Sequence, residues 1–191
     1  MTTPDKRRAI LQALERILRD HRFDEVKMDD IARSAGVGKG TVYRYFEDKE
    51  DLFLQMVQAF LQEEVDEVSV AAASSMPPRE KLIHVGETIG RHIQLHGTYI
   101  RMMHGRQFFR GKQGTHEIMR DHHDRLGRIL SQILEDAEQA GLLRPGLDAD
   151  AVLCIYKGAI MSSSMRLLHS GQVVPMADIM DLILSGIGRG P

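Results

Sequence analysis

The sequence has few features that would place the protein outside the cell or in a membrane. Its 191 residues include one cysteine, Cys154, so an intramolecular disulfide is impossible. Because Cys154 lies in an apolar helical stretch, we expect it to be a small buried side chain. The N-terminal residues MTTPDKRR lack an apolar run behind their charges, and no stretch reaches the ~18 continuous apolar residues of a spanning helix. We therefore expect a soluble, cytoplasmic protein with no membrane contact.

Motifs of catalysis and metal binding are also missing. Eight of the nine histidines lie between positions 84 and 169, and His92 and His96 have the four-residue spacing of helical metal sites. No HExxH motif, cysteine pair or Glu-x-x-His set accompanies them. The segment RGKQGT is no P-loop, because its first glycine and spacing are wrong and no strand precedes it. We expect no enzymatic activity, no metal and no cofactor. The histidine count alone supports the alternative, an enzyme with a helical metal site.

The chain has little excess charge of either sign. Its formal net charge is −2, and residues 1–50 hold eleven Lys or Arg against ten Asp or Glu. Binding to a polyanion would therefore depend on where a few basic groups are placed, because the bulk charge is close to neutral.

Apolar residues recur at helical spacing, and no alternating strand pattern occurs anywhere. The sequence predicts an all-α fold of about nine helices. We expect glycines and prolines to divide the chain, with a loop at 69–78 and an interruption at Gly97. The expected segments are Thr3 to about His21, two short helices within 28–46, a helix from Asp48, one from Arg79 to Gly97, Thr98 to about Phe109, 115–140, 148–169 and 176–187.

The stretch Met28–Lys49, MDDIARSAGVGKGTVYRYFEDK, is the most informative part of the chain. Its first helix has an apolar face, and Gly36 can adopt the left-handed conformation that ends a helix. A second apolar set follows at Val42, Tyr45 and Phe46. This pattern is typical of a helix-turn-helix, whose second helix enters the major groove of DNA.

The second helix of this stretch breaks the usual rules for helix stability. Gly38 and Gly40 lie in its first turn, where an interior glycine costs about 1 kcal/mol relative to alanine. Lys39 places a cation at the positive end of the helix dipole. Glycines that let the backbone come close, beside a lysine, suit a phosphate or a base edge. The alternative is that the two glycines only loosen a turn.

The first fifty residues resemble the DNA-binding domain of the TetR family of bacterial repressors. An amphipathic first helix and DDIARSAGVGKGTVYRYFEDKEDL carry the resemblance, which covers about a quarter of the chain. Two positions depart from the family pattern. Lys27 stands where the family usually has Thr or Ser as a helix cap, and Gly38 stands where it often has Ser.

Residues expected to touch double-stranded operator DNA come from the second helix and the residue that opens the next one. Lys39, Thr41 and Arg44 are candidates for reading bases, and the hydroxyls of Tyr43 and Tyr45 suit phosphates. Gly40 would let the backbone approach. Lys49 resembles the phosphate-clamping lysine of the family. The alternatives are that Tyr45 is mainly core and that Lys49 is an exposed helix-terminal lysine.

The two C-terminal helices are too apolar to be freely solvated. They could belong to an intramolecular core, or they could form a four-helix bundle with a second copy of the chain. Symmetric DNA sites require two heads about 34–36 Å apart, or a multiple of this, and the family resemblance implies the same homodimer. We expect a DNA-binding domain at 1–50 and a ligand-binding and dimerisation domain at 51–191.

The resemblance also implies a pocket for a small-molecule effector between the helices of the second domain. An apolar, Met-rich lining with a few polar tips suits a hydrophobic or aromatic ligand. The candidates are Met56, Phe60, Ile89, His92, Ile93, His96, Met103, Phe108, Met119, His122, Leu126 and Tyr156. For each residue the alternative is ordinary core. Histidines in such a pocket could tune a response near neutral pH.

Together these patterns predict a dimeric transcriptional regulator, a repressor that a ligand releases from its operator by linkage. The sequence does not name the effector or the operator. Activation in place of repression stays open, as does a helix-turn-helix that serves only protein contact.

Overall fold

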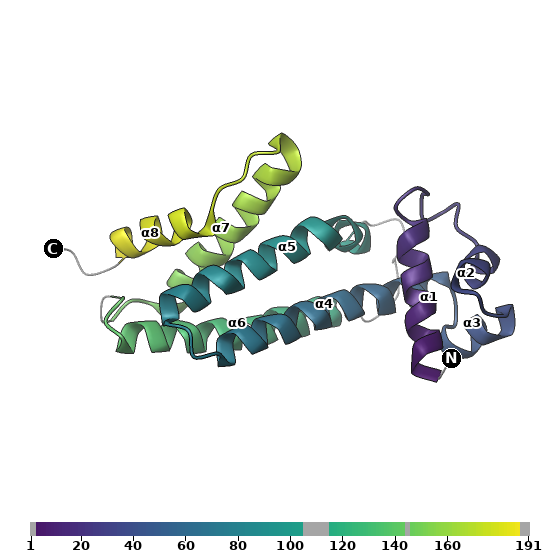
Figure 1. Cartoon of the computed structure of the whole chain (residues 1–191), viewed down its shortest axis with the longest axis horizontal. Helices are drawn as coiled ribbons and strands as arrows, with labels where there is room; N and C mark the ends of the chain where they lie inside the picture. Colours follow the sequence, from purple (N-terminus) through teal and green to yellow (C-terminus); the bar gives the residue numbers. More distant parts are fainter. Residues whose placement is uncertain (1–2, 105–114, 144–145, 188–191) are drawn as a thin grey trace. The chain divides into compact units, whose positions relative to one another are not determined.

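The computed structural model describes residues 3–104, 115–143 and 146–187. This part of the chain is helical, with eight α-helices and no strand, which confirms the all-α class (Figure 1). The helices are α1 (Thr3–Ile17), α2 (Met28–Ala35), α3 (Lys39–Tyr45), α4 (Lys49–Ala73), α5 (Pro78–His104), α6 (Thr115–Gln139), α7 (Ala149–Ser170) and α8 (Met176–Ile187).

Gly97 does not interrupt a helix, and the prediction that it would was wrong. Helix α5 runs through it without a break, and Gly97 itself is buried. The ~1 kcal/mol propensity cost of a glycine is small beside the packing of a long buried helix face, so tertiary packing wins. For a similar reason α4 continues to Ala73, into the segment 69–78 that was expected to be a loop.

The chain forms two compact units. Unit 1 comprises Met1–Phe60 and Tyr99–Thr115, and unit 2 comprises Leu61–Thr98 and His116–Pro191. Helices α4 and α5 each contribute one part to each unit. The functional division at residue 50 stays a prediction.

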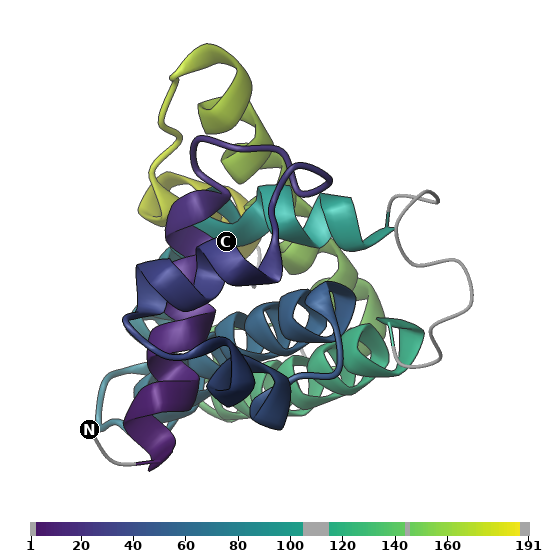
Figure 2. The same cartoon turned by 90° about the vertical axis from the view of Figure 1, so that its right-hand side faces the viewer.

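The core of unit 1 joins the first three helices. Figures 1 and 2 show α2 and α3 beside α1, connected by a tight turn. Ile10 and Leu14 of α1 are fully buried, as are Ile31 of α2 and Val42 of α3. These residues repeat at helical spacing, so burying one face of each helix fixes which faces stay exposed.

The turn between α2 and α3 has the geometry expected from its glycine. Gly36 adopts φ 67° and ψ 33°, in the left-handed region. The amide of Gly36 donates to the carbonyl of Arg33 at 3.2 Å, and that of Val37 donates to Ala32 at 3.0 Å. These bonds satisfy carbonyls that the end of α2 would leave free, and they reverse the chain into α3.

The core of unit 2 draws on helices α4 to α8. It includes Val68, Leu130 and Met180, which are almost fully buried. In Figures 1 and 2 the unit 2 part of α4 lies beside α6. Tyr156 is buried at the centre and its hydroxyl donates to the carbonyl of Leu82 at 2.5 Å, while burial raises the pKa of the phenol.

Helix α7 leaves an apolar face uncovered. It is the one helix in the described ranges that is long and apolar enough to cross a membrane by length and composition alone. Ile155 and Met161 are each 50% exposed, and Leu182 of α8 is 74% exposed. Cys154 is exposed as well, so the expectation that it is buried was wrong for the single chain. An apolar helix can turn one face to its own core and another to a partner.

Substitution by alanine should have opposite effects at Gly36 and at Gly40. Gly36→Ala should lower the free energy of unfolding by about 1–2 kcal/mol, because alanine is strained at positive φ. Gly40→Ala is the matched control, since Gly40 lies in α3 with nothing within 4 Å of an added Cβ. It should raise stability by about 0.5–1 kcal/mol. Urea unfolding of both variants checks this, and equal effects would contradict the left-handed turn.

Candidate nucleic-acid interface and effector site

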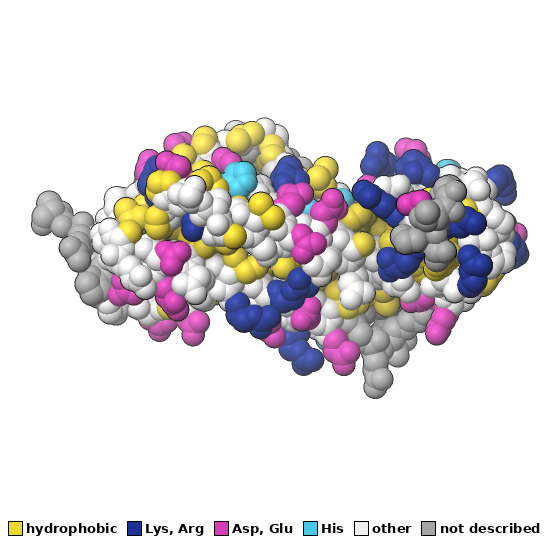
Figure 3. Space-filling view, turned by 60° about the horizontal axis from the view of Figure 1, so that its bottom comes forward, with side chains coloured by type: hydrophobic (Ala, Val, Ile, Leu, Met, Phe, Trp, Pro, Cys, Tyr) yellow, Lys and Arg dark blue, Asp and Glu magenta, His cyan; other side chains and the backbone are white. Residues whose placement is uncertain are grey.

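Helix α3 presents one face to the core and the other to solvent. Val42 and the following Phe46 are buried, whereas Lys39, Gly40, Tyr43 and Arg44 are exposed. Thr41 and Tyr45 are half-buried. The structure therefore gathers six of the seven predicted DNA contacts on this helix, and four of them are exposed. Figure 3 shows Lys and Arg side chains gathered on the visible face of the unit that carries α1–α3.

Neither helix of the motif receives a side-chain cap at its N-terminus. Lys27 before α2 and Gly38 before α3 both have extended backbones and make no capping hydrogen bond. This is the local loss of capping that the departures from the family pattern lead one to expect.

Lys39 is held at the start of α3 by a carboxylate. Its Nζ lies 2.8 Å from Oδ1 of Asp29 and 6.0 Å from the ring centroid of Tyr43. The hydrogen bond and the charge of Asp29 raise the pKa of the lysine. Because the pair is exposed, a DNA phosphate or base can replace Asp29 at little cost.

Arg44 and Tyr45 form a stacked pair. The guanidinium carbon lies 5.2 Å from the ring centroid of Tyr45, and Nη2 donates to the Tyr45 hydroxyl at 3.5 Å. A half-buried tyrosine thus supports an exposed arginine. Stacking restricts the arginine side chain, so its planar group would lose less freedom on binding a planar acceptor.

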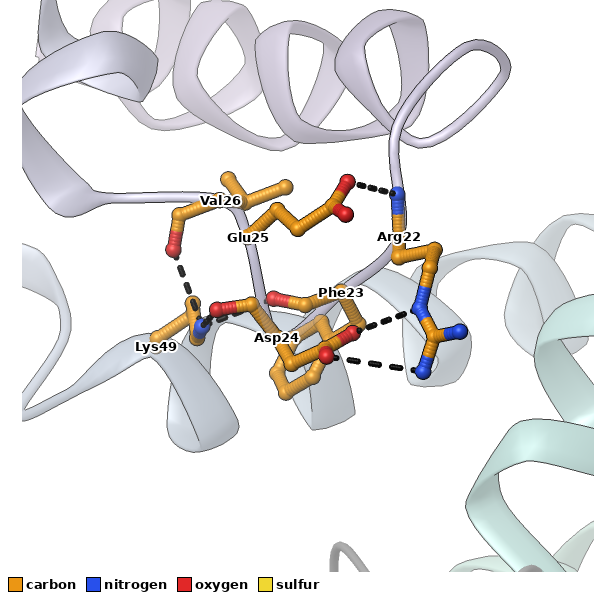
Figure 4. A network of polar contacts seen from close by, with 6 residues as sticks. All are labelled: Arg22, Phe23, Asp24, Glu25, Val26 and Lys49. Atoms are coloured by element: carbon orange, nitrogen blue, oxygen red, sulfur yellow. Dashed lines mark hydrogen bonds and ion pairs between the residues drawn. The ribbon is translucent and has the colours of Figure 1, made fainter.

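Lys49 makes contacts that the sequence did not reveal. Its ammonium donates to the carbonyls of Phe23 at 2.7 Å, Val26 at 2.9 Å and Asp24 at 3.4 Å (Figure 4). It also lies 4.6 Å from the ring centroid of Phe23. An ammonium has three N–H donors, and here three carbonyls face them. A direct bond to phosphate would require one of these contacts to break. The phosphate contact of Lys49 stays a prediction, and in this structure its ammonium holds the loop before α2.

Contacts of Arg22 also hold the loop before α2. The guanidinium of Arg22 contacts both carboxylate oxygens of Asp24, at 3.2 and 3.5 Å, and the Arg22 amide donates to Glu25 at 3.3 Å (Figure 4). The hydrogen bond from Arg22 lowers the pKa of Asp24. These exposed contacts are weak individually, so the part-buried contacts of the Lys49 ammonium are the main anchor of the loop.

The predicted effector residues fall in both units. In unit 1, Met56 is fully buried and Phe60 stacks on Tyr99 with centroids 5.9 Å apart. The side chain of Met103 and all of Phe108 lie outside the described residues. The candidates in unit 2 lie on α5, on α6 or, for Tyr156, in the core: Ile89, His92, Ile93, His96, Met119, His122, Leu126 and Tyr156. Among these, Tyr156 has a core role, with its hydroxyl already bonded.

Two carboxylates of α4 face the histidines of unit 2. Nε2 of His122 lies 3.5 Å from Oε2 of Glu64, and Nε2 of His92 lies 3.4 Å from Oε2 of Glu67. Glu67 also pairs with Arg91, and this hydrogen bond lowers the pKa of its carboxyl group. Within the described ranges no group of three or more His, Cys, Asp or Glu is arranged to hold a metal ion.

Glu64 is the residue that sequence reasoning missed. It is only 4% exposed, between Leu61 and Val68 on the buried face of α4. A signal was available, because Glu64 falls three residues after Leu61 and four before Val68. A charge within an apolar helical stripe marks a position that folding alone would fill with a hydrophobic residue.

Comparisons with known proteins show which proteins this chain is similar to. The family model described as "Bacterial regulatory proteins, tetR family" matches residues 10–56. The "Fatty acid metabolism regulator protein" of Bacillus subtilis is 22% identical over 187 residues, 93% of each chain. The "Probable acrEF/envCD operon repressor" of Escherichia coli K12 is 28% identical over 73% of this chain and 65% of its own. The structure of the regulator FadR of Bacillus subtilis with stearoyl-CoA has a TM-score of 0.69 at 20% identity, over 93% of this chain and 95% of the other.

Lys49 and Lys39 should differ in how they affect DNA binding. Lys49→Met should lower the free energy of unfolding by about 1–3 kcal/mol, because the loop carbonyls, two of them in part-buried contacts, lose their ammonium donor. Where the variant is folded, the salt dependence of DNA binding should be unchanged. Lys39→Ala should leave stability nearly unchanged and weaken binding to operator DNA by about 1–3 kcal/mol, because Lys39 is expected to read a base edge. Urea unfolding and binding titrations at several salt concentrations measure both. A weaker salt dependence of DNA binding in the Lys49 variant would instead show that Lys49 contacts a phosphate.

Proposed function

The chain belongs to the TetR family of bacterial regulatory proteins, and from this premise we propose that it is a dimeric, cytoplasmic repressor that a small hydrophobic ligand releases from operator DNA. The accessible face of α3 is the single observation that carries this proposal. This exposed face carries basic side chains, a glycine and a stacked arginine. The opposite face of α3 packs into the core of unit 1. The protein is a transcriptional regulator and not an enzyme.

The DNA side of the proposal assigns a role to each exposed group. Lys39, Thr41 and Arg44 read base edges, and Tyr43 meets a phosphate. Gly40 lets the backbone come close to the duplex. Tyr45 supports Arg44 through their stacking contact, and Lys49 acts indirectly by fixing the loop before α2. Residues 1–50 form the DNA-binding domain in this proposal.

The dimer is proposed to form through α7 and α8. The exposed face of α7 carries small and apolar residues over three turns and no charge: Ala151, Cys154, Ile155, Gly158, Met161 and Ser162. Leu182 of α8 adds to it. Small residues let two helices approach closely, and a two-fold axis brings the same face of each copy together. Two heads can then meet successive major grooves.

The effector side of the proposal assigns ligand binding and dimerisation to residues 51–191. A relative crystallised with stearoyl-CoA and a relative named as an operon repressor support a hydrophobic ligand and a negative regulatory sign. The ligand would prefer a spacing of the two heads that does not fit successive grooves. It would then weaken DNA binding by the difference in its own affinity for the two spacings, commonly 1–3 kcal/mol.

Selection from a pool of random duplexes tests the proposed function. We expect the protein to retain duplexes that share a two-fold symmetric sequence, and a screen of apolar compounds should find one that releases them. Retention of no duplex, even at low salt, would contradict DNA binding and would favour a helix-turn-helix used for protein contact.

Arg44→Ala should relax the choice of base at one position of each half-site. The expected loss is about 1–3 kcal/mol of binding free energy for the selected duplex and little for random DNA. Arg19→Ala is the control, because Arg19 is also exposed but pairs with Glu15 on α1. Titration of both variants against selected and random duplexes decides the matter. An equal loss on both duplexes would remove Arg44 from base reading.

Cys154 offers a natural probe of the dimer. Because it lies on the proposed interface, its thiol should react with Ellman's reagent much more slowly in the native protein than after unfolding in urea. Ile155→Glu should give a monomer with a reactive thiol, since a charge would be buried against the partner. Leu95→Glu, on an exposed site of α5, should change neither. Fast reaction of the native wild-type thiol would contradict this interface.

A further inference from the structure

Unit 2 buries polar side chains that its own packing does not explain. Glu64 and His92 are each 4% exposed, and the side chain of His122 is 11% exposed. They come from α4, α5 and α6. Glu64 and Glu67 lie three residues apart on α4, and each faces one of the histidines. The two imidazoles therefore lie against adjacent turns of the same helix.

The ring nitrogens of these two histidines have no hydrogen-bond partner in the described chain. This holds for Nδ1 and Nε2 of both His92 and His122. Nε2 of each does lie within ion-pair distance of a carboxylate, at 3.4 Å for His92 and 3.5 Å for His122. A buried polar group without a partner costs about 1–3 kcal/mol, and natural proteins usually satisfy it with water or a ligand.

The two carboxylates differ in their charge balance. Glu67 has Arg91 as a cationic partner. Glu64 has no Lys or Arg partner among the described residues, and its one ion-pair contact is with His122. A buried carboxylate accepts hydrogen bonds and favours a positive charge nearby. Among the described residues, Glu64 therefore has no permanent positive charge beside it, and a bound cation would supply one.

Apolar side chains surround these polar groups on the same helix faces. On α6, Met119 and Leu126 lie three residues before and four residues after His122. On α5, Ile89 lies three residues before His92 and is 8% exposed. A molecule bound here would meet an apolar surface with one acidic point.

We propose that the effector is an apolar molecule that carries a protonated amine, and this inference rests on the proposed function. The ammonium donates to the carboxylate of Glu64, which is buried beside His122. The apolar part packs on the faces of α5 and α6. An anionic head, such as a carboxylate or a phosphate, would meet the negative charge of Glu64.

Three probes with the same eight-carbon chain test the head group: octylamine, octanol and octanoate. Their binding to the full-length protein is measured by calorimetry without DNA at neutral pH. We expect octylamine to bind about tenfold more tightly than octanol, and octanoate to bind most weakly, because a hydrogen bond to a charged group is stronger than a neutral one. The wild-type comparison needs no variant. Octanoate binding as tightly as octylamine would overturn the proposal.

Glu64→Gln locates the site. This variant keeps the shape but removes the charge, so octylamine affinity should fall about tenfold while octanol affinity changes little. Glu63→Gln, at the exposed neighbouring position, is the matched control and should bind all three probes like the wild type. Circular dichroism checks folding. Should Glu64→Gln fail to fold, His122→Gln replaces it, with a smaller expected loss of octylamine affinity. Unchanged octylamine affinity in a folded Glu64 or His122 variant would overturn the site.

Adding the selected operator duplex separates the two proposals. Octylamine should release the wild-type protein from the duplex and should release the Glu64→Gln variant only at about tenfold higher concentration. Release by octanol or octanoate but not by octylamine would overturn the amine head and leave the proposed function standing. Failure to bind any duplex would overturn the proposed function. It would not affect the test of the amine head, because octylamine binding is measured without DNA.

Discussion

The ammonium of Lys49 is the contact on which the DNA-binding unit depends. It joins the first residue of α4 to three carbonyls of the loop that leads into α2. That loop sets where α2 begins, the Gly36 turn then sets the direction of α3, and the burial of Val42 sets which face of α3 is exposed. Lys49, whose positive charge would suit a DNA phosphate, thus contacts backbone carbonyls of the protein itself. The exposed side chains of α3, Lys39, Tyr43 and Arg44, are the ones that we propose meet DNA.

The features that we connect with function lie where the sequence is unfavourable for local stability. Helix α3 has a glycine and a lysine in its first turn and no side-chain cap, and the rest of unit 1 compensates by packing. Unit 2 buries Glu64 and two histidines where hydrophobic side chains would pack at lower cost. The exposed apolar face of α7 is a third example. The three features correspond to the three partners that we propose for the protein: DNA, an effector and a second copy.

Features set by local sequence could be predicted, and features set by distant contacts could not. The Gly36 turn and the exposed face of α3 follow from helical spacing and from the conformational freedom of one glycine. The continuity of α5 through Gly97 depends on packing that exceeds a ~1 kcal/mol propensity cost. The role of Lys49 depends on carbonyls more than twenty residues away, which leave no mark on the sequence. Cys154 was misjudged because an apolar pattern does not say whether its own core or a partner covers the helix.

Hydroxyl-radical footprinting of the selected operator duplex tests most directly whether α3 heads of a dimer read the DNA. We expect two protected patches on one face of the duplex, with centres one helical turn (10–10.5 base pairs) or a whole multiple apart, and loss of both when Lys39 and Arg44 are changed to alanine. A single patch, patches on opposite faces, or an unchanged footprint in the double variant would contradict this arrangement.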